Sequence, residues 1–164
     1  MASAIVNELR KKSDAAWVNL TRQLQGMEPH LDRADAPGQW TTRQVLAHLL
    51  GESGRSPVDF LRKFSDVDLP VSELTPGQTR VTAERERLTL RQLLDAVDAQ
   101  RREVFAYLEG LTETELKRRA RIPFLKQFRG TDEVTAAEYV GLLYDLHWDD
   151  HAGQLAKIRK AVGL

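Results

Sequence analysis

Apolar residues recur every three or four positions along most of the chain, which is the spacing of an amphipathic helix. The first such pattern covers residues 4–24 and includes Ile5, Leu9, Trp17 and Leu20. It stops at Glu28 and Pro29, and the Pro- and Asp-rich stretch up to Gly38 is typical of a loop. The pattern therefore predicts a first helix over residues 4–24.

A second helix is predicted from Thr41 to about Phe64. Thr41 and Gln44 have the spacing of a capping box, and Trp40 precedes them as an apolar anchor. Because three helix breakers follow, we expect a kink or a break near Ser56. These breakers are Gly51, Gly54 and Pro57.

Residues 65–86 have the composition of a long connection. They contain Leu69-Pro70 and Pro76-Gly77 among alternating polar residues, which favours a loop that crosses the bundle over a strand of a sheet. Since connections of this length are often functional, we expect this one to border a site.

The remaining apolar patterns predict long helices over residues 89–111 and 135–162. Between them, Thr112 and Glu115 have the spacing of a capping box and predict a short helix. No strand pair is expected. The sequence therefore predicts an all-α four-helix bundle, forming a single domain over residues 1–164.

Composition narrows the classes of function. The 24 basic and 24 acidic side chains cancel, so no overall field attracts nucleic acid or an anionic membrane, and we expect neither as a partner. The absence of cysteine excludes disulfides, thiolate nucleophiles and cysteine-ligated zinc. The first ten residues lack the apolar run of a signal peptide, and no 18-residue apolar stretch follows, so we expect a cytoplasmic protein.

Two of the four histidines, His147 and His151, stand four residues apart in the last predicted helix and therefore project from one face. At about 100° per residue, that face is largely apolar, which predicts that the pair points inward. The face that carries the two histidines also carries Val140, Leu143, Tyr144, Gln154 and Ile158. A shared metal ion would give both buried rings a partner, since unsatisfied polar groups are costly to bury. The alternative is a coincidental pair on the surface.

His48 offers a third imidazole on a polar face of the second helix. Such a face is typical of a solvated surface, but it would also suit a polar cleft open to water. Glu52, one turn further on, is a candidate fourth ligand, a residue that orients a ligand, or a general base. Its alternative is a surface carboxylate paired with Arg55 or Arg43. His30 lies in the loop and is assigned no role.

Two known metal motifs do not fit these histidines. The zincin motif needs a glutamate directly after the first histidine, where Trp148 stands. The ferritin-like di-iron motif needs a glutamate three residues before a histidine, which neither His147 nor His151 has. A mononuclear site is the hypothesis that remains.

Two segments resemble the DinB/YfiT-like superfamily, and the likeness spans nearly the whole chain. They are WTTRQVLAHL at residues 40–49 and LHWDDHAGQL at residues 146–155. The resemblance implies an up-down-down-up bundle with a long crossover between helices two and three, and a homodimer. It also implies one divalent ion, with nickel or zinc favoured, bound by His48, His147 and His151.

The same resemblance implies a metal-dependent enzyme that acts on a small molecule. Characterised relatives include thiol S-transferases that use mycothiol or bacillithiol, a mycothiol-dependent maleylpyruvate isomerase, and hydrolases. Thiol S-transfer, with a low-molecular-weight thiol as co-substrate, and hydrolysis therefore both stay open. The competing class is a non-catalytic, dimeric, stress-associated metal-binding or interaction bundle.

Three neutral imidazoles would leave a coordination position open for water or a thiol, whose pKa the ion would lower. Glu52 is the candidate for proton transfer and Tyr144 for a hydrogen bond to substrate, with a core-edge aromatic as the alternative for Tyr144. The basic residues from Lys117 to Arg121 could attract an anionic substrate, although a solvated turn is the favoured interpretation. Recruitment of Glu52 as a fourth ligand would favour the non-catalytic class.

Overall fold

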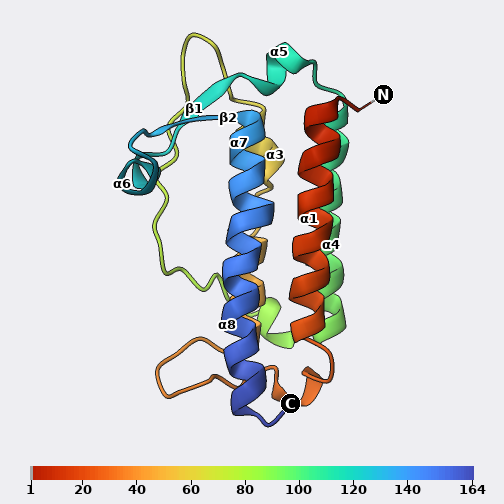
Figure 1. Cartoon of the computed structure of the whole chain (residues 1–164). Coiled ribbons are helices and arrows are strands. Elements are labelled where there is room, and N and C mark those ends of the chain that lie inside the picture. Colours follow the sequence, from red (N-terminus) through yellow and green to blue (C-terminus); the bar gives the residue numbers. More distant parts are fainter. Residues whose placement is uncertain (1) are drawn as a thin grey trace.

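The computed structural model describes residues 2–164 and shows a bundle of four helical rods. The rods are α1 (Ala4–Gln23), α2 (Thr42–Leu50) followed by α3 (Pro57–Leu61), α4 (Leu90–Glu109), and α7 (Ala136–Gly141) continuing through η4 (Leu142–Leu146) into α8 (His147–Ala161). In Figure 1, α1 and the last rod run in one direction, while α2–α3 and α4 run in the opposite direction. The up-down-down-up bundle is therefore confirmed.

A long crossover, residues 62–89, joins the two middle rods. Because these rods are parallel, the chain must return along the whole bundle before α4 begins (Figure 1). A short 3₁₀ helix, η2 (Arg85–Arg87), ends the crossover. α1 packs along α8, and α2 packs against both α4 and α8, so the second and last rods face each other.

The helix starts follow the capping boxes read from the sequence. At α2, Thr41 Oγ1 accepts from the Gln44 backbone N–H at 3.1 Å, and Gln44 Oε1 accepts from the Thr41 N–H at 2.8 Å. The same reciprocal bonds open α5 (Glu113–Leu116) and α7. Each arrangement satisfies two backbone donors that the first helical turn leaves unpaired.

The second rod breaks earlier than predicted. α2 ends at Leu50, where Gly51 adopts a φ of 71°, and α3 begins only after Ser56. This positive φ, with a ψ of −162°, turns the chain out of the helix, and glycine adopts the conformation without steric cost. The break near Ser56 is thus real, but it extends over residues 51–56.

The prediction that no strands pair was wrong. β1 (Arg119–Arg121) and β2 (Glu133–Thr135) form an antiparallel pair, with the buried Ala120 opposite Val134. Three residues are too few to show the alternation of apolar and polar residues that marks a strand. This part of the basic segment therefore resembled a turn in the sequence. Between the strands lie η3 (Pro123–Leu125) and α6 (Lys126–Arg129).

The last rod contains one turn that is not α-helical. In η4, which is a π-helical turn, the His147 N–H bonds the Leu142 carbonyl, five residues earlier. A π turn holds one more residue than an α turn, so faces assigned at 100° per residue shift across it. The sequence predicts the extent of this rod correctly but not its internal register.

The core lies between the four rods and contains large, fully buried side chains from each. They include Leu20, Leu46, Leu93, Tyr144, Trp148 and Leu155. Within residues 2–164, none of the helices combines the length and the apolar character needed to span a membrane.

Candidate metal centre

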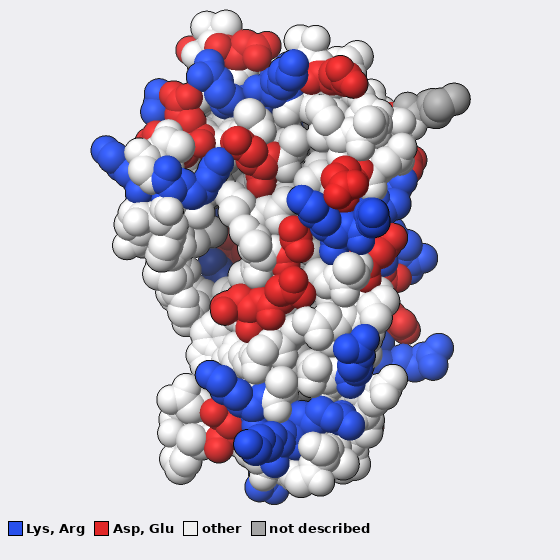
Figure 2. Space-filling model, in the orientation of Figure 1, with Lys and Arg blue, Asp and Glu red and all other residues white. Residues whose placement is uncertain are grey.

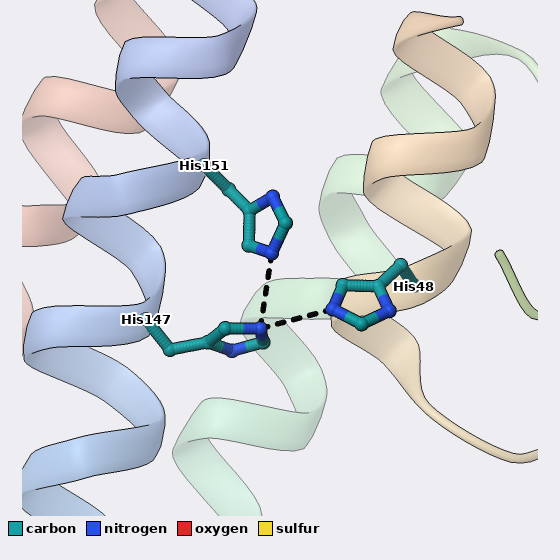
Figure 3. A group of neighbouring side chains, drawn as sticks. All are labelled: His48, His147 and His151. Atoms are coloured by element: carbon teal, nitrogen blue, oxygen red, sulfur yellow. Dashed lines mark hydrogen bonds between the residues drawn. The ribbon is translucent and has the colours of Figure 1, made fainter. Parts of the chain in front are cut away.

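Three imidazoles converge between the second and the last rod. His147 and His151 project from α8 toward His48 on α2, as Figure 3 shows. The distance between Nε2 of His48 and Nε2 of His147 is 3.0 Å, and that between Nε2 of His151 and Nε2 of His147 is also 3.0 Å. One nitrogen of each ring lies within 4.8 Å of the others, so the three rings form one cluster.

Two of these rings are oriented by hydrogen bonds on their far side. Nδ1 of His48 lies 2.6 Å from the backbone carbonyl oxygen of Gln78, in the crossover. Nδ1 of His151 lies 2.8 Å from the side-chain oxygen of Gln154, one turn further along α8. Both partner atoms are oxygens that can only accept a hydrogen bond. Each Nδ1 therefore carries the hydrogen, and the Nε2 of the same ring presents a lone pair to the cluster.

The two Nε2–Nε2 contacts of this cluster share at most one hydrogen, so they cannot both be hydrogen bonds. Nε2 of His147 faces the lone pairs of both His48 and His151, and it can donate one hydrogen to only one of them. The other nitrogen pair then meets lone pair to lone pair unless a cation lies between the rings. The residues present therefore fit a shared metal ion.

The spacing of the nitrogens is also compatible with a common ion. With metal–nitrogen bonds of 2.0–2.1 Å, two ligands at bond angles of 90–110° lie about 2.8 to 3.4 Å apart. Both Nε2–Nε2 separations of 3.0 Å fall in this range. Outward hydrogen bonds from Nδ1 to a carbonyl are the usual support for histidine ligands.

Burial keeps the central ring neutral. Burial, together with the smaller effects of the neighbouring His151 and His48, lowers the pKa of His147 to about 3, against the opposing effect of the Leu143 carbonyl. Burial likewise lowers the pKa of His48, although its bond to the Gln78 carbonyl opposes this shift. Neutral imidazole is the form that binds a metal, so no proton has to leave at neutral pH.

Trp40 covers one side of the cluster, a role that the sequence analysis missed. Its ring centroid lies 5.0 Å from that of His48, and it stacks on His151 at 6.2 Å with an interplanar angle of 5°. The sequence indicated only its place ahead of the Thr41 cap. Gln78 acts through its backbone carbonyl, which no side-chain pattern reveals.

Glu52 lies outside this cluster. It follows the end of α2, and its exposed carboxylate pairs with Arg55 at 3.1 Å. Because the helix ends at Leu50, Glu52 does not continue the face that carries His48. This placement matches the alternative of a surface carboxylate paired with Arg55. His30, in η1 (Glu28–His30), also lies outside the cluster.

Tyr144 lies in the core and is 1% exposed. Its hydroxyl donates to the Gln100 side-chain oxygen at 3.1 Å, and burial raises its pKa above the ordinary value. The face prediction assumed regular α-helix, whereas the π turn that contains Tyr144 changes the register before His147. This placement matches the alternative of a core aromatic.

The basic residues around β1 are neutralised by acids. Arg119 pairs with Glu133 at 2.8 Å, and Arg121 pairs with Asp132 at 3.0 Å. Arg129 pairs with Glu138 at 3.3 Å. Since these charges already have partners, this segment gives little attraction for an anionic substrate.

The fold and the cluster together define a class of up-down-down-up helical bundles with a histidine triad between the second and last helices. The family model described as the DinB superfamily matches residues 7–155, and the chain belongs to the DinB superfamily.

One solved structure has the same fold along most of the chain. It is described as "YfiT from Bacillus subtilis is a probable metal-dependent hydrolase with an unusual four-helix bundle topology". The match has a TM-score of 0.64 and 19% identity, and it covers 95% of this chain and 85% of YfiT. At this identity the similarity establishes the fold alone. No curated protein matches the chain.

Proposed function

We propose that this protein is a mononuclear, divalent-metal-dependent hydrolase of small molecules, with His48, His147 and His151 as the metal ligands. The observation that carries the proposal is a cluster of three imidazoles without a carboxylate. Structural metal sites usually have four protein ligands, whereas catalytic sites have three and keep one position for water or substrate. Nickel and zinc are the proposed ions.

A bound divalent ion supplies Lewis acidity, which lowers the pKa of a coordinated water or thiol toward neutrality. The protein's own contribution is to fix the ligands, through the Gln78 carbonyl at His48 and the Gln154 side chain at His151. Trp40 excludes water from one side of the rings. The description of YfiT as a probable metal-dependent hydrolase supports the choice of hydrolysis.

Thiol S-transfer is the second candidate, because an open position that binds water also binds a thiolate. The chain has no cysteine, so the thiol would enter as a co-substrate. The two reactions share their ligands and differ in the nucleophile. A screen must therefore offer both esters or amides in water and electrophiles with a low-molecular-weight thiol.

We further propose a single domain over residues 1–164, a homodimer, a cytoplasmic location, no nucleic-acid partner, and catalytic roles for Glu52 and Tyr144. Light scattering on the purified chain tests the homodimer. For Glu52, proton transfer predicts a fall in kcat of about 10²- to 10⁴-fold in Glu52→Gln, whereas its surface ion pair predicts no change.

The first experiment measures the metal content of protein purified without a metal-affinity tag. We expect one divalent ion per chain by elemental analysis, and its loss in His147→Ala. His30→Ala is the matched control, because it removes the histidine outside the cluster and should keep the ion. A wild-type protein that contains no metal and takes up neither nickel nor zinc would overturn the proposal.

Activity is then tested on metal-loaded protein. Hydrolysis that requires the ion, and is lost with it in His147→Ala, would support the proposed reaction. Full occupancy without turnover of any ester, amide or thiol-electrophile pair would favour the non-catalytic class instead.

A further inference from the structure

We propose that Arg80 binds an anionic group of the substrate, so that the site accepts small molecules carrying a carboxylate besides the group that reacts at the metal. The inference rests on the proposed function and names its substrate class. Arg80 lies in the crossover, two residues after Gln78 in the sequence.

The crossover is attached to α2 on both sides of Arg80. Before it, the Gln78 carbonyl binds Nδ1 of His48 at 2.6 Å. After it, the buried Arg85 guanidinium donates to the carbonyls of Ala47 and Gly51, at 3.1 and 2.6 Å, and to that of Arg80 itself at 2.8 Å. The backbone of Arg80 is therefore held beside the histidine cluster.

Arg80 has a strained backbone. Its φ is 58°, and it is the one residue other than glycine with a positive φ in the described part of the chain. A left-handed conformation is costly for a residue with a Cβ, whereas glycine would adopt it freely. A large charged side chain at such a position, next to a candidate site, indicates a function for that side chain.

Among the described residues, no acidic side chain pairs with the charge of Arg80. Arg80 is half-buried, and it makes no ion pair within residues 2–164. Burial is the main cause that lowers the pKa of His48, and the Arg80 charge contributes to the same shift. The arginines of β1, in contrast, are paired with Asp132 and Glu133.

A dication at the cluster would add to this uncompensated positive charge. An anionic group on the substrate offsets both charges, and a guanidinium binds a carboxylate with two parallel hydrogen bonds. In Figure 2, a narrow hollow with charged atoms inside it opens between the crossover and the last rod. We take this hollow as the route by which a small molecule passes the crossover.

The test compares two thiols on cobalt-loaded, full-length protein. 3-Mercaptopropionate carries a carboxylate and 2-mercaptoethanol does not, and the thiolate-to-cobalt absorption reports the binding of each without any turnover. We expect the wild type to bind 3-mercaptopropionate about tenfold more tightly, since hydrogen bonds to charged groups reach that magnitude.

Two variants assign the preference to Arg80. Arg80→Asn removes the charge but keeps the left-handed backbone, which asparagine tolerates, so its melting temperature should not fall. We expect it to lose most of the preference, bind 2-mercaptoethanol as the wild type does, and hold cobalt at least as tightly. Arg87→Gln removes a charge from η2 in the same crossover and should keep the preference.

An unchanged preference in Arg80→Asn would overturn the inference, because the carboxylate would then be chelating the cobalt itself. Equal binding of both thiols by the wild type would overturn it as well, while leaving the metal site intact. Protein that holds no cobalt would overturn the proposed function, and the inference with it.

Discussion

Trp40 connects the histidine cluster to a spectroscopic signal. It contacts His48 and stacks on His151, whereas Trp17 and Trp148 pack against each other at 5.6 Å. We expect nickel to quench the intrinsic fluorescence, because the bound ion would lie beside the Trp40 ring. A titration should show most of this change lost in Trp40→Phe, with one nickel still bound per chain.

The matched control is Trp17→Phe, which removes a tryptophan of α1 and should keep most of the quenching. Equal quenching in wild type and Trp40→Phe would show that the ion binds elsewhere.

Tyr144 illustrates a core side chain with a buried polar end. Its hydroxyl binds the Gln100 oxygen, and the Gln100 nitrogen donates to the Leu50 carbonyl at 2.8 Å, so three rods are joined. Tyr144→Phe leaves the Gln100 oxygen unpaired, and we expect the free energy of unfolding to fall by about 1–2 kcal/mol. Denaturant unfolding measures this, while metal content should not change.

Tyr107→Phe on α4 is the control for this experiment. Its ring is more exposed, so the substitution should lower the free energy of unfolding by less than Tyr144→Phe does. If Tyr144→Phe were fully stable but inactive when loaded with metal, the substrate-binding role predicted for this hydroxyl would gain support.

The end of α2 is stabilised by a side chain that comes from the crossover. The Arg85 guanidinium, itself largely buried, donates to the carbonyls of Ala47 and Gly51, where the helix leaves its last acceptors unpaired. Arg85→Ala exposes these acceptors without a partner, so we expect a loss of about 2–3 kcal/mol in unfolding free energy. Chemical denaturation gives the value.

Arg87→Ala, an exposed neighbour on η2, should remain within about 0.5 kcal/mol of wild type. Because Arg85 also holds the Arg80 carbonyl, hydrogen exchange of residues 78–82 should rise in Arg85→Ala. Protection equal to wild type in that segment would show that the crossover is held by other contacts.

Sequence patterns predict the elements whose ends are fixed by contacts between residues close together in the chain. Thr41 with Gln44 and Thr135 with Glu138 place two helix starts correctly, because a cap is a contact between residues three apart. The π turn at residues 142–146 has no such signal, and the face assigned to Tyr144 assumed a regular α-helix across it. The β1–β2 pair depends on contacts between residues 12 to 16 positions apart, within two three-residue strands.

The same distinction applies to the site. The sequence predicts that His48, His147 and His151 lie together, because an i, i+4 pair and a helix-borne partner are visible in one sequence, and the three rings do cluster. The Gln78 carbonyl and the Arg80 backbone lie in a connection whose path depends on contacts with α2. The sequence did not show that Gly51 ends the helix directly before Glu52, which places this carboxylate outside the cluster.

The proposed ligands join parts of the chain that are far apart in sequence. His48 and His147 are 99 residues apart, and they link the second rod to the last one. An ion that binds only the folded state stabilises it by RT ln(1 + [L]/Kd), about 2.7 kcal/mol at a hundredfold excess over Kd. For a chain of this size we expect the melting temperature to rise by roughly 5–10 °C.

Calorimetry with and without nickel or zinc measures this shift, and a chelator should reverse it. His147→Ala should melt at one temperature under all conditions, whereas His30→Ala should respond as wild type does. Surface binding to scattered carboxylates and histidines would instead stabilise all three proteins equally. A shift confined to proteins with an intact triad would therefore place the ion between α2 and α8, where the two halves of the bundle meet.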